Sequence, residues 1–146
     1  MPEIASAVER EIRIDASAET VFAYLIEPDK MPLWMGSSAE LDPRPGGIYR
    51  VTINPKVVAS GEFVEVEPPR RVLFTWGWEG DENPTKPGSS TVEITLEADG
   101  EATLVRVVHR DLGEEQRAPH DHGWGLYLDR LAIIATGGEA GPDPNA

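Results

Sequence analysis

Charged and hydrophobic residues alternate near the start of the chain, and this period of two predicts a half-buried strand over residues 8–15. The spacing then changes to that of a helix. Ser17 stands in the position of a helix N-cap, and Glu19 adds negative charge to the first turn. An apolar helical stripe follows, and Pro28 ends it. Residues 29–35 predict a second short helical segment.

Five further segments show strand-like alternation, and residues typical of turns separate them. The segments are residues 48–53, 57–66, 72–78, 91–96 and 103–109. The clearest break is Asp99-Gly100, because this pair suits a type I′ hairpin turn. Short turns join antiparallel neighbours, so the segments together predict an antiparallel meander.

Helical spacing returns over residues 114–136, which predict a long final helix. Its apolar face consists of Trp124, Leu128, Leu131 and Ala135. Asp129 and Arg130 lie on the opposite side, which we expect to face solvent. We expect a single domain over residues 8–136, preceded by an N-terminal extension at residues 1–7 and followed by a flexible acidic tail at residues 137–146.

Composition narrows the classes of function. The 146 residues suffice for one domain, and they carry 26 acidic against 13 basic side chains, a net charge of −13. This charge argues against binding to nucleic acid or to anionic membranes. The chain has no cysteine, which excludes disulfides and thiol chemistry. Neither a membrane-spanning run nor a secretory signal is evident, so we expect a cytoplasmic protein.

Several segments, in this order, carry a family resemblance: Glu27-Pro28-Asp29-Lys30, Trp34, Asp42-Pro43-Arg44-Pro45-Gly46-Gly47, Gly61-Glu62, Glu65-Val66-Glu67-Pro68-Pro69-Arg70-Arg71, Val72-Leu73-Phe74-Thr75-Trp76, His109, Gly123-Trp124 and Leu128-Asp129-Arg130-Leu131. They resemble the START-like (SRPBCC) superfamily. Within it, they are most similar to bacterial proteins akin to the C-terminal domain of the activator of heat-shock protein 90 ATPase. The resemblance implies an α+β helix-grip fold, in which a curved antiparallel sheet wraps around the C-terminal helix. It also implies a cavity for an apolar small molecule between the two.

Strand parity gives the inward-facing side chains. On the last predicted strand, Arg106 and Arg110 should face water, which turns Val107 and His109 inward. The candidate cavity residues, from this parity and from the helices, are Trp34, Tyr49, Val51, Phe63, Phe74, Trp76, Val107, His109, Trp124 and Leu128. They could line a ligand cavity, because such sites are mostly apolar with few polar groups. They could equally fill an ordinary core.

The histidines are the sharpest polar candidates. His109 could act as a general base or could be a structural histidine, and the lack of a partner nucleophile favours the structural role. His120 and His122 could hold a metal, but a polar first turn of the last helix explains them without one. Phosphate-binding and hydrolase motifs do not occur. We therefore predict no catalytic residue, no cofactor and no metal.

Three functions remain open. The first is a binding domain for an apolar or amphipathic small molecule, and the second is an enzyme of the polyketide cyclase or aromatase kind that uses the same cavity. The third is a co-chaperone, which the resemblance implies. Few acid or base residues face inward, which favours binding over catalysis. A homodimer is compatible with the resemblance, and no exposed apolar stripe in the sequence demands one.

Overall fold

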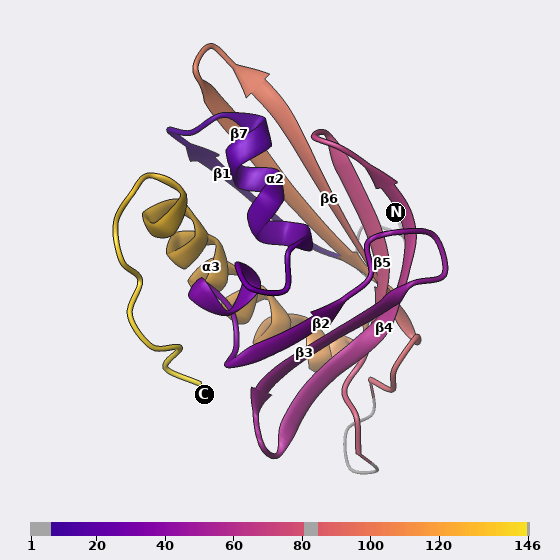
Figure 1. The fold of residues 1–146 in the computed structure, drawn as a ribbon. Helices are drawn as coiled ribbons and strands as arrows, with labels where there is room; N and C mark the ends of the chain where they lie inside the picture. Colours follow the sequence, from indigo (N-terminus) through magenta and orange to yellow (C-terminus); the bar gives the residue numbers. More distant parts are fainter. Residues whose placement is uncertain (1–6, 81–84, 146) are drawn as a thin grey trace.

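A seven-stranded antiparallel sheet curves around a long C-terminal helix in the computed structural model, which describes residues 7–80 and 85–145 (Figure 1). The elements in chain order are β1 (Val8–Ile14), α2 (Ala18–Ile26), the 3-10 turn η1 (Met31–Leu33), β2 (Ser38–Leu41), β3 (Ile48–Asn54), β4 (Val57–Glu67), β5 (Arg71–Trp76), β6 (Ser90–Asp99), β7 (Ala102–Arg110) and α3 (Glu114–Ala135). The strand order is β1-β7-β6-β5-β4-β3-β2. The predicted helix-grip fold is thus confirmed.

Alternating side chains build the concave face of the sheet. Burial follows a period of two along β3, β5, β6 and β7, so that the inward set predicted by parity is buried. Arg106 and Arg110 are exposed, as predicted. Gly100 closes the β6–β7 hairpin with φ of 64°, a conformation that favours glycine. A register shift between Phe63 and Glu65 marks a bulge in β4, and Phe63 stays in the core.

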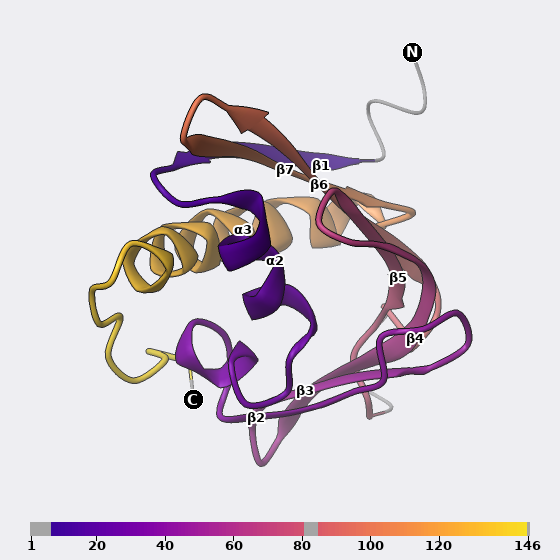
Figure 2. The same ribbon diagram turned by 45° about the horizontal axis from the view of Figure 1, so that its top comes forward.

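The helices cover the concave face. Figure 2 shows the sheet as a curved wall, with α3 lying along its inner side beneath β1 and β7 and with α2 and η1 toward the open side. Ser17 caps α2 by accepting a hydrogen bond from the backbone N–H of Thr20, as predicted. Two details differ from prediction. The second helical segment is a single 3-10 turn, and the sequence pattern did not reveal β2, a short edge strand of partly exposed residues.

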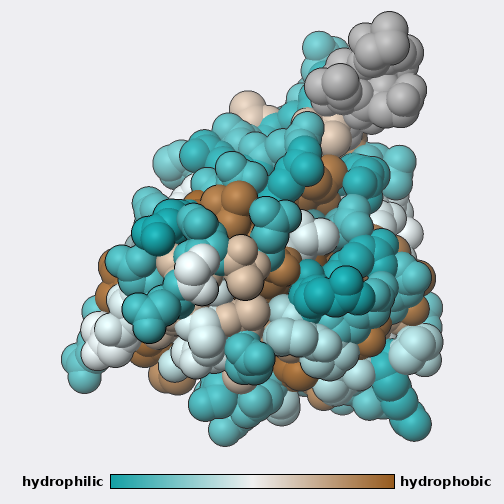
Figure 3. Space-filling model, turned by 90° about the horizontal axis from the view of Figure 1, so that it is seen from above, coloured by the Kyte–Doolittle hydropathy of each residue, from teal (hydrophilic) through white to brown (hydrophobic). Residues whose placement is uncertain are grey.

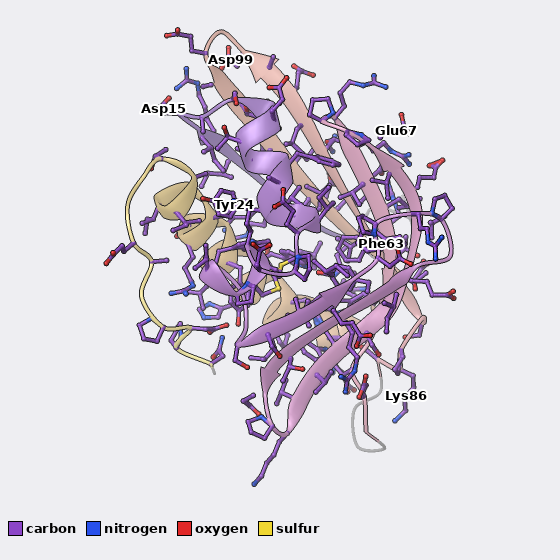
Figure 4. The ribbon with its side chains drawn as sticks, viewed as in Figure 1. Asp15, Tyr24, Phe63, Glu67, Lys86 and Asp99 are labelled. Atoms are coloured by element: carbon purple, nitrogen blue, oxygen red, sulfur yellow. The ribbon has the colours of Figure 1, made fainter. Side chains whose placement is uncertain are left out.

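Aromatic side chains fill the middle of the concave face. The rings of Tyr49 and Phe74 stack with centroids 4.0 Å apart. Phe63, labelled in Figure 4, packs edge-on against Tyr49. Trp76 lies 6.4 Å from Phe74, between ring centroids. Such pairs contribute about 0.5–1.5 kcal/mol each beyond the burial of their area. This part of the interior is therefore packed solid.

The face of the molecule shown in Figure 3 is mostly hydrophilic. The view in Figure 3, from the end that carries the β6–β7 hairpin, shows hydrophilic residues over most of that face with hydrophobic ones interspersed. On the outer face of the sheet, Arg71 forms ion pairs with Glu65, Glu67 and Glu93, and Arg110 shares Glu93. The carboxylates of Glu65 and Glu67 on β4 are thus partly neutralised by arginine on the solvent side. No helix in the described part of the chain is long and apolar enough to cross a membrane.

The segment after α3 contacts the rest of the domain through two buried charged side chains. Arg130, expected to face solvent, is buried. It donates hydrogen bonds to backbone carbonyls of the segment after η1 and of the segment after α3. Its acceptors are Trp34, Ala140, Gly141 and Pro142. Asp143 is also buried and accepts from the Tyr127 hydroxyl at 2.7 Å and from the Gly36 backbone N–H at 2.7 Å. The guanidinium and carboxylate thereby attach residues 137–145 to α3 and η1.

We predict that Asp143→Ala destabilises the protein, because the Tyr127 hydroxyl and the Gly36 N–H then lose their buried acceptor. The expected loss is about 2 kcal/mol in the free energy of unfolding, measured by urea denaturation. Glu139→Ala is the matched control, because Glu139 lies in the same segment with an exposed side chain. Equal stabilities of the two variants would show that the segment is not attached through Asp143.

Candidate functional site

A cavity that is open to solvent on one side lies beside the packed aromatic cluster, at the end of the sheet where the β3–β4 turn and the loop after β5 lie. Lys86, labelled in Figure 4, marks that loop. The cavity has a volume of about 420 Å³, which is within the usual range for small-molecule sites. The described residues that line it are Met35, Ile53, Asn54, Val57, Trp76, Trp78, Gln116, Pro119, His120, Gly123, Trp124, Tyr127 and Asn145.

Three tryptophans form the aromatic wall of the cavity. Trp76 ends β5, and Trp78 continues the same inward parity two residues later. Their rings are perpendicular, with centroids 5.3 Å apart. Trp124 faces Trp76 from α3 at 5.8 Å between centroids. Gly77, between the first two, passes so close to the chain at Lys86 that a Cβ would lie 1.7 Å from its carbonyl oxygen. Glycine at this position therefore permits the approach that places Trp78.

His109 is held in a chain of buried hydrogen bonds. The indole N–H of Trp124 donates to its Nδ1 at 3.1 Å, so the ring proton of the neutral imidazole lies on Nε2. Nε2 is 2.9 Å from the Ser90 hydroxyl, which in turn donates to the Trp76 carbonyl at 2.7 Å. One orientation of protons satisfies all three bonds. His109 therefore links α3 to β5 through β6 and β7.

His120 repeats this arrangement with the opposite tautomer. The indole N–H of Trp78 donates to its Nε2 at 3.0 Å, and its Nδ1 lies 2.7 Å from the Gln116 carbonyl. The proton is therefore on Nδ1. Its ring centroid lies 5.1 Å from that of His109. Both histidines are thus neutral, with all four of their ring nitrogens engaged.

Burial keeps these imidazoles uncharged. Desolvation, with a smaller contribution from the neighbouring His120, lowers the pKa of His109 to about 3. Desolvation also lowers the pKa of His120, partly opposed by its hydrogen bond to the Gln116 backbone. Neither group is set up to exchange protons near neutral pH. The imidazoles in and behind the cavity wall therefore contribute dipoles and no net charge.

The C-terminal segment forms one side of the cavity. Asn145 lines it, and its carbonyl accepts a hydrogen bond from the Asn54 side chain at 2.9 Å. The Asn145 side chain donates to the Tyr127 hydroxyl at 3.2 Å, and that hydroxyl donates to Asp143. Burial raises the pKa of Tyr127 above its usual value. The segment anchored by Arg130 therefore belongs to the site.

Of the ten candidate cavity residues from the sequence, Trp76 and Trp124 line the void. The other eight are buried but lie in the packed interior and are not among the lining residues: Trp34, Tyr49, Val51, Phe63, Phe74, Val107, His109 and Leu128. His109 stands directly behind the wall through its bond to Trp124. The ion pair of Glu79 with Arg50 lies outside the lining.

Several lining residues were not predicted, although strand parity or helical spacing in the sequence points to them. Trp78 shares the parity of Trp76, and His120 stands four residues before Trp124 on the same helical face. The predicted polar first turn is wrong for His120, because α3 begins at Glu114 and His120 is buried. Asn145 lies outside any strand or helix, so no periodic pattern could have predicted it. Among the described residues, no three potential ligands are grouped to hold a metal ion.

The sequence model of the Activator of Hsp90 ATPase homolog 1-like protein family matches residues 15–136. The chain belongs to this family. An AHSA1-like protein from Rhizobium etli is 43% identical, with a TM-score of 0.75 and coverage of 96% of this chain and 88% of that one. CalU16 from Micromonospora echinospora is 27% identical, with a TM-score of 0.73 and coverage of 90% and 76%.

DynU16, a protein of the dynemicin biosynthetic locus, has a TM-score of 0.82 at 24% identity over 94% of this chain and 50% of that one, which shows the fold alone. The comparison with curated proteins gave no match.

We predict that His109 makes stability depend on pH. The unfolded chain binds the proton near pH 6.5 and the folded chain only near pH 3, so stability is complete above pH 6.5 and is lost as the pH falls toward 3. The slope reaches about 1.4 kcal/mol per pH unit. His109→Gln keeps one acceptor and one donor but cannot titrate, so it should flatten this part of the curve in urea denaturation. Identical slopes for both proteins would contradict the assignment.

Proposed function

We propose that this chain is a binding domain for a neutral, apolar, aromatic small molecule, held between β3–β5 and α3. The single observation that carries the proposal is the cavity of about 420 Å³ beside three tryptophans in an otherwise packed interior. The lining is mainly apolar, so a bound apolar molecule would remove this surface from water and gain dispersion contacts with it.

The lining favours a neutral guest. None of the described residues that line the cavity is an aspartate, glutamate, lysine or arginine, and the one lining histidine is neutral. Arg50 has the outward parity of β3 and is paired with Glu79 at 2.7 Å, which lowers the pKa of the carboxylate. A charged guest would therefore lose its hydration without gaining a partner. This supports a neutral ligand over an acidic one.

The walls favour a flat guest. The rings of Trp76, Trp78 and Trp124 present faces and edges to one space, and aromatic pairs prefer edge-to-face or offset arrangements. Each ring is held in place from behind, Trp78 and Trp124 by their indole bonds and Trp76 by its strand. A preformed aromatic slot binds a rigid planar molecule with little loss of conformational entropy.

The same geometry supports binding more than acid–base catalysis. His109 and His120 use both of their ring nitrogens within the protein, so neither offers a free base to a guest. Tyr127 donates its hydroxyl proton to Asp143, and burial raises its pKa. The polar groups near the cavity thus hold its shape.

We predict that Gly123→Leu abolishes binding of a neutral bicyclic probe such as acetylnaphthalene. Gly123 lines the cavity on α3, and a Cβ there meets no atom within 4 Å, so the longer side chain can enter the void without a clash. Leucine also favours the helix by about 1 kcal/mol over glycine, so the fold should be kept. Quenching of tryptophan fluorescence measures the binding.

Ala118→Leu is the matched control, since it adds leucine to an exposed position of the same helix outside the lining. It should bind the probe as the parent does. Naphthoate, the anionic analogue, should bind at least tenfold more weakly than acetylnaphthalene. Unchanged binding by Gly123→Leu, or stronger binding of the anion, would contradict the proposed site.

A further inference from the structure

The lining of the cavity has a buried part and a more exposed part. The buried residues, which we call the floor, are mostly apolar or aromatic: Met35, Ile53, Trp76, His120, Trp124 and Tyr127. The rest of the lining, which we call the rim, is partly or fully exposed and contains the side-chain amides of Asn54, Gln116 and Asn145. An occupant would therefore meet apolar surface at the floor and neutral polar groups at the rim.

Two of these three rim amides are engaged within the protein. Asn54 donates to the Asn145 carbonyl at 2.9 Å and accepts from the Lys56 backbone N–H at 2.8 Å. The Asn145 side chain donates to the Tyr127 hydroxyl. These bonds attach the C-terminal segment to β3 and α3. The side chains of Asn54 and Asn145 thus have a structural role.

Gln116 differs from both. Its backbone N–H donates to the Gly113 carbonyl and its backbone carbonyl bonds the His120 ring, but its side-chain amide has no hydrogen-bond partner among the described residues. Gln116 is partly exposed, and the Trp76 indole nitrogen is the one fully buried side-chain nitrogen or oxygen without a partner in the described part of the chain, so the Gln116 amide reaches water. Gln116 therefore has both a free donor and a free acceptor at an accessible position.

The helical spacing of α3 turns Gln116 toward the cavity. The lining residues of α3 form one helical stripe, which consists of Gln116, Pro119, His120, Gly123, Trp124 and Tyr127. Glu115 and Arg117, its neighbours in sequence, are not part of the lining. Gln116 begins the stripe, and long helical side chains lean toward the helix N-terminus. Its amide therefore lies beyond His120, at the rim.

We propose that Gln116 determines the specificity of the cavity by pairing with a neutral head group of the guest. Such a head group, carried at one end of the planar rings, has both a hydrogen-bond donor and an acceptor, as in a primary carboxamide. The rings then pack against the tryptophans while the head group stays at the rim. This inference rests on the proposed function and narrows its ligand class. A head group that only accepts, such as a ketone, uses only the donor of Gln116.

The test compares naphthamide with acetylnaphthalene substituted at the same ring position, in which a methyl group replaces the amide NH₂. Dissociation constants of both probes are measured by tryptophan fluorescence for the parent protein and for Gln116→Met. Methionine keeps the length and the helix propensity of glutamine but has no amide. The preference for naphthamide over acetylnaphthalene should fall by about 2- to 10-fold in Gln116→Met, the usual value of one hydrogen bond.

Ala118→Met is the matched control, because it adds the same side chain to an exposed position of α3 outside the lining. It should keep the preference of the parent protein. An equal loss of preference in Ala118→Met would contradict the inference.

The side-chain NH₂ resonances of Gln116, assigned in the parent protein, give a second readout that needs no variant. They should move downfield when naphthamide binds. If naphthamide binds but these resonances stay in place and the preference is unchanged in Gln116→Met, the inference is wrong and the proposed function stands. If neither probe binds the parent protein, the proposed function itself fails.

Discussion

Two hydrogen bonds from indole to imidazole determine the character of this interior. Trp124 donates to His109 and Trp78 donates to His120, and each bond assigns the remaining proton of its imidazole to the other nitrogen. Burial then keeps both rings uncharged. A protonated imidazole could not accept the indole proton, so charging either ring would break the wall of the cavity. The neutrality of the site and its shape therefore have one cause.

The remaining structure holds these two pairs in place. Ser90 connects His109 to the backbone of Trp76, and the β5–β6 register places Trp76 opposite Ser90. On the other side of the cavity, Arg130 and Asp143 attach the C-terminal segment, which brings Asn145 to the cavity. The segment completes a wall that sheet and helix alone leave open. Hydrogen-bonded polar groups behind the aromatic wall thus hold the cavity in a fixed shape.

The sequence predicts the architecture well because the architecture depends on periodicity. Inward parity correctly buries His109, Phe74 and Trp76, and the resemblance gives the order of the elements. The cavity itself is not periodic. It depends on how far α3 stands from the sheet, so Tyr49 and Phe74, predicted as cavity residues, stack on each other away from the lining. The buried Arg130 and the attached C-terminal segment escaped prediction, since backbone carbonyls as partners leave no trace in a sequence.

The most direct test of this account is a proton–nitrogen correlation spectrum of the four indole groups, recorded without and with acetylnaphthalene. Three indole protons are bonded within the protein, and that of Trp76 has no acceptor among the described residues. The account predicts that binding of the probe leaves the indole hydrogen bonds of the protein intact. The resonances of Trp78 and Trp124 should keep their hydrogen-bonded positions apart from small ring-current shifts. If Trp78 or Trp124 loses its hydrogen-bonded shift when the probe binds, the histidine pairs do not hold the wall of the cavity and the central claim is wrong.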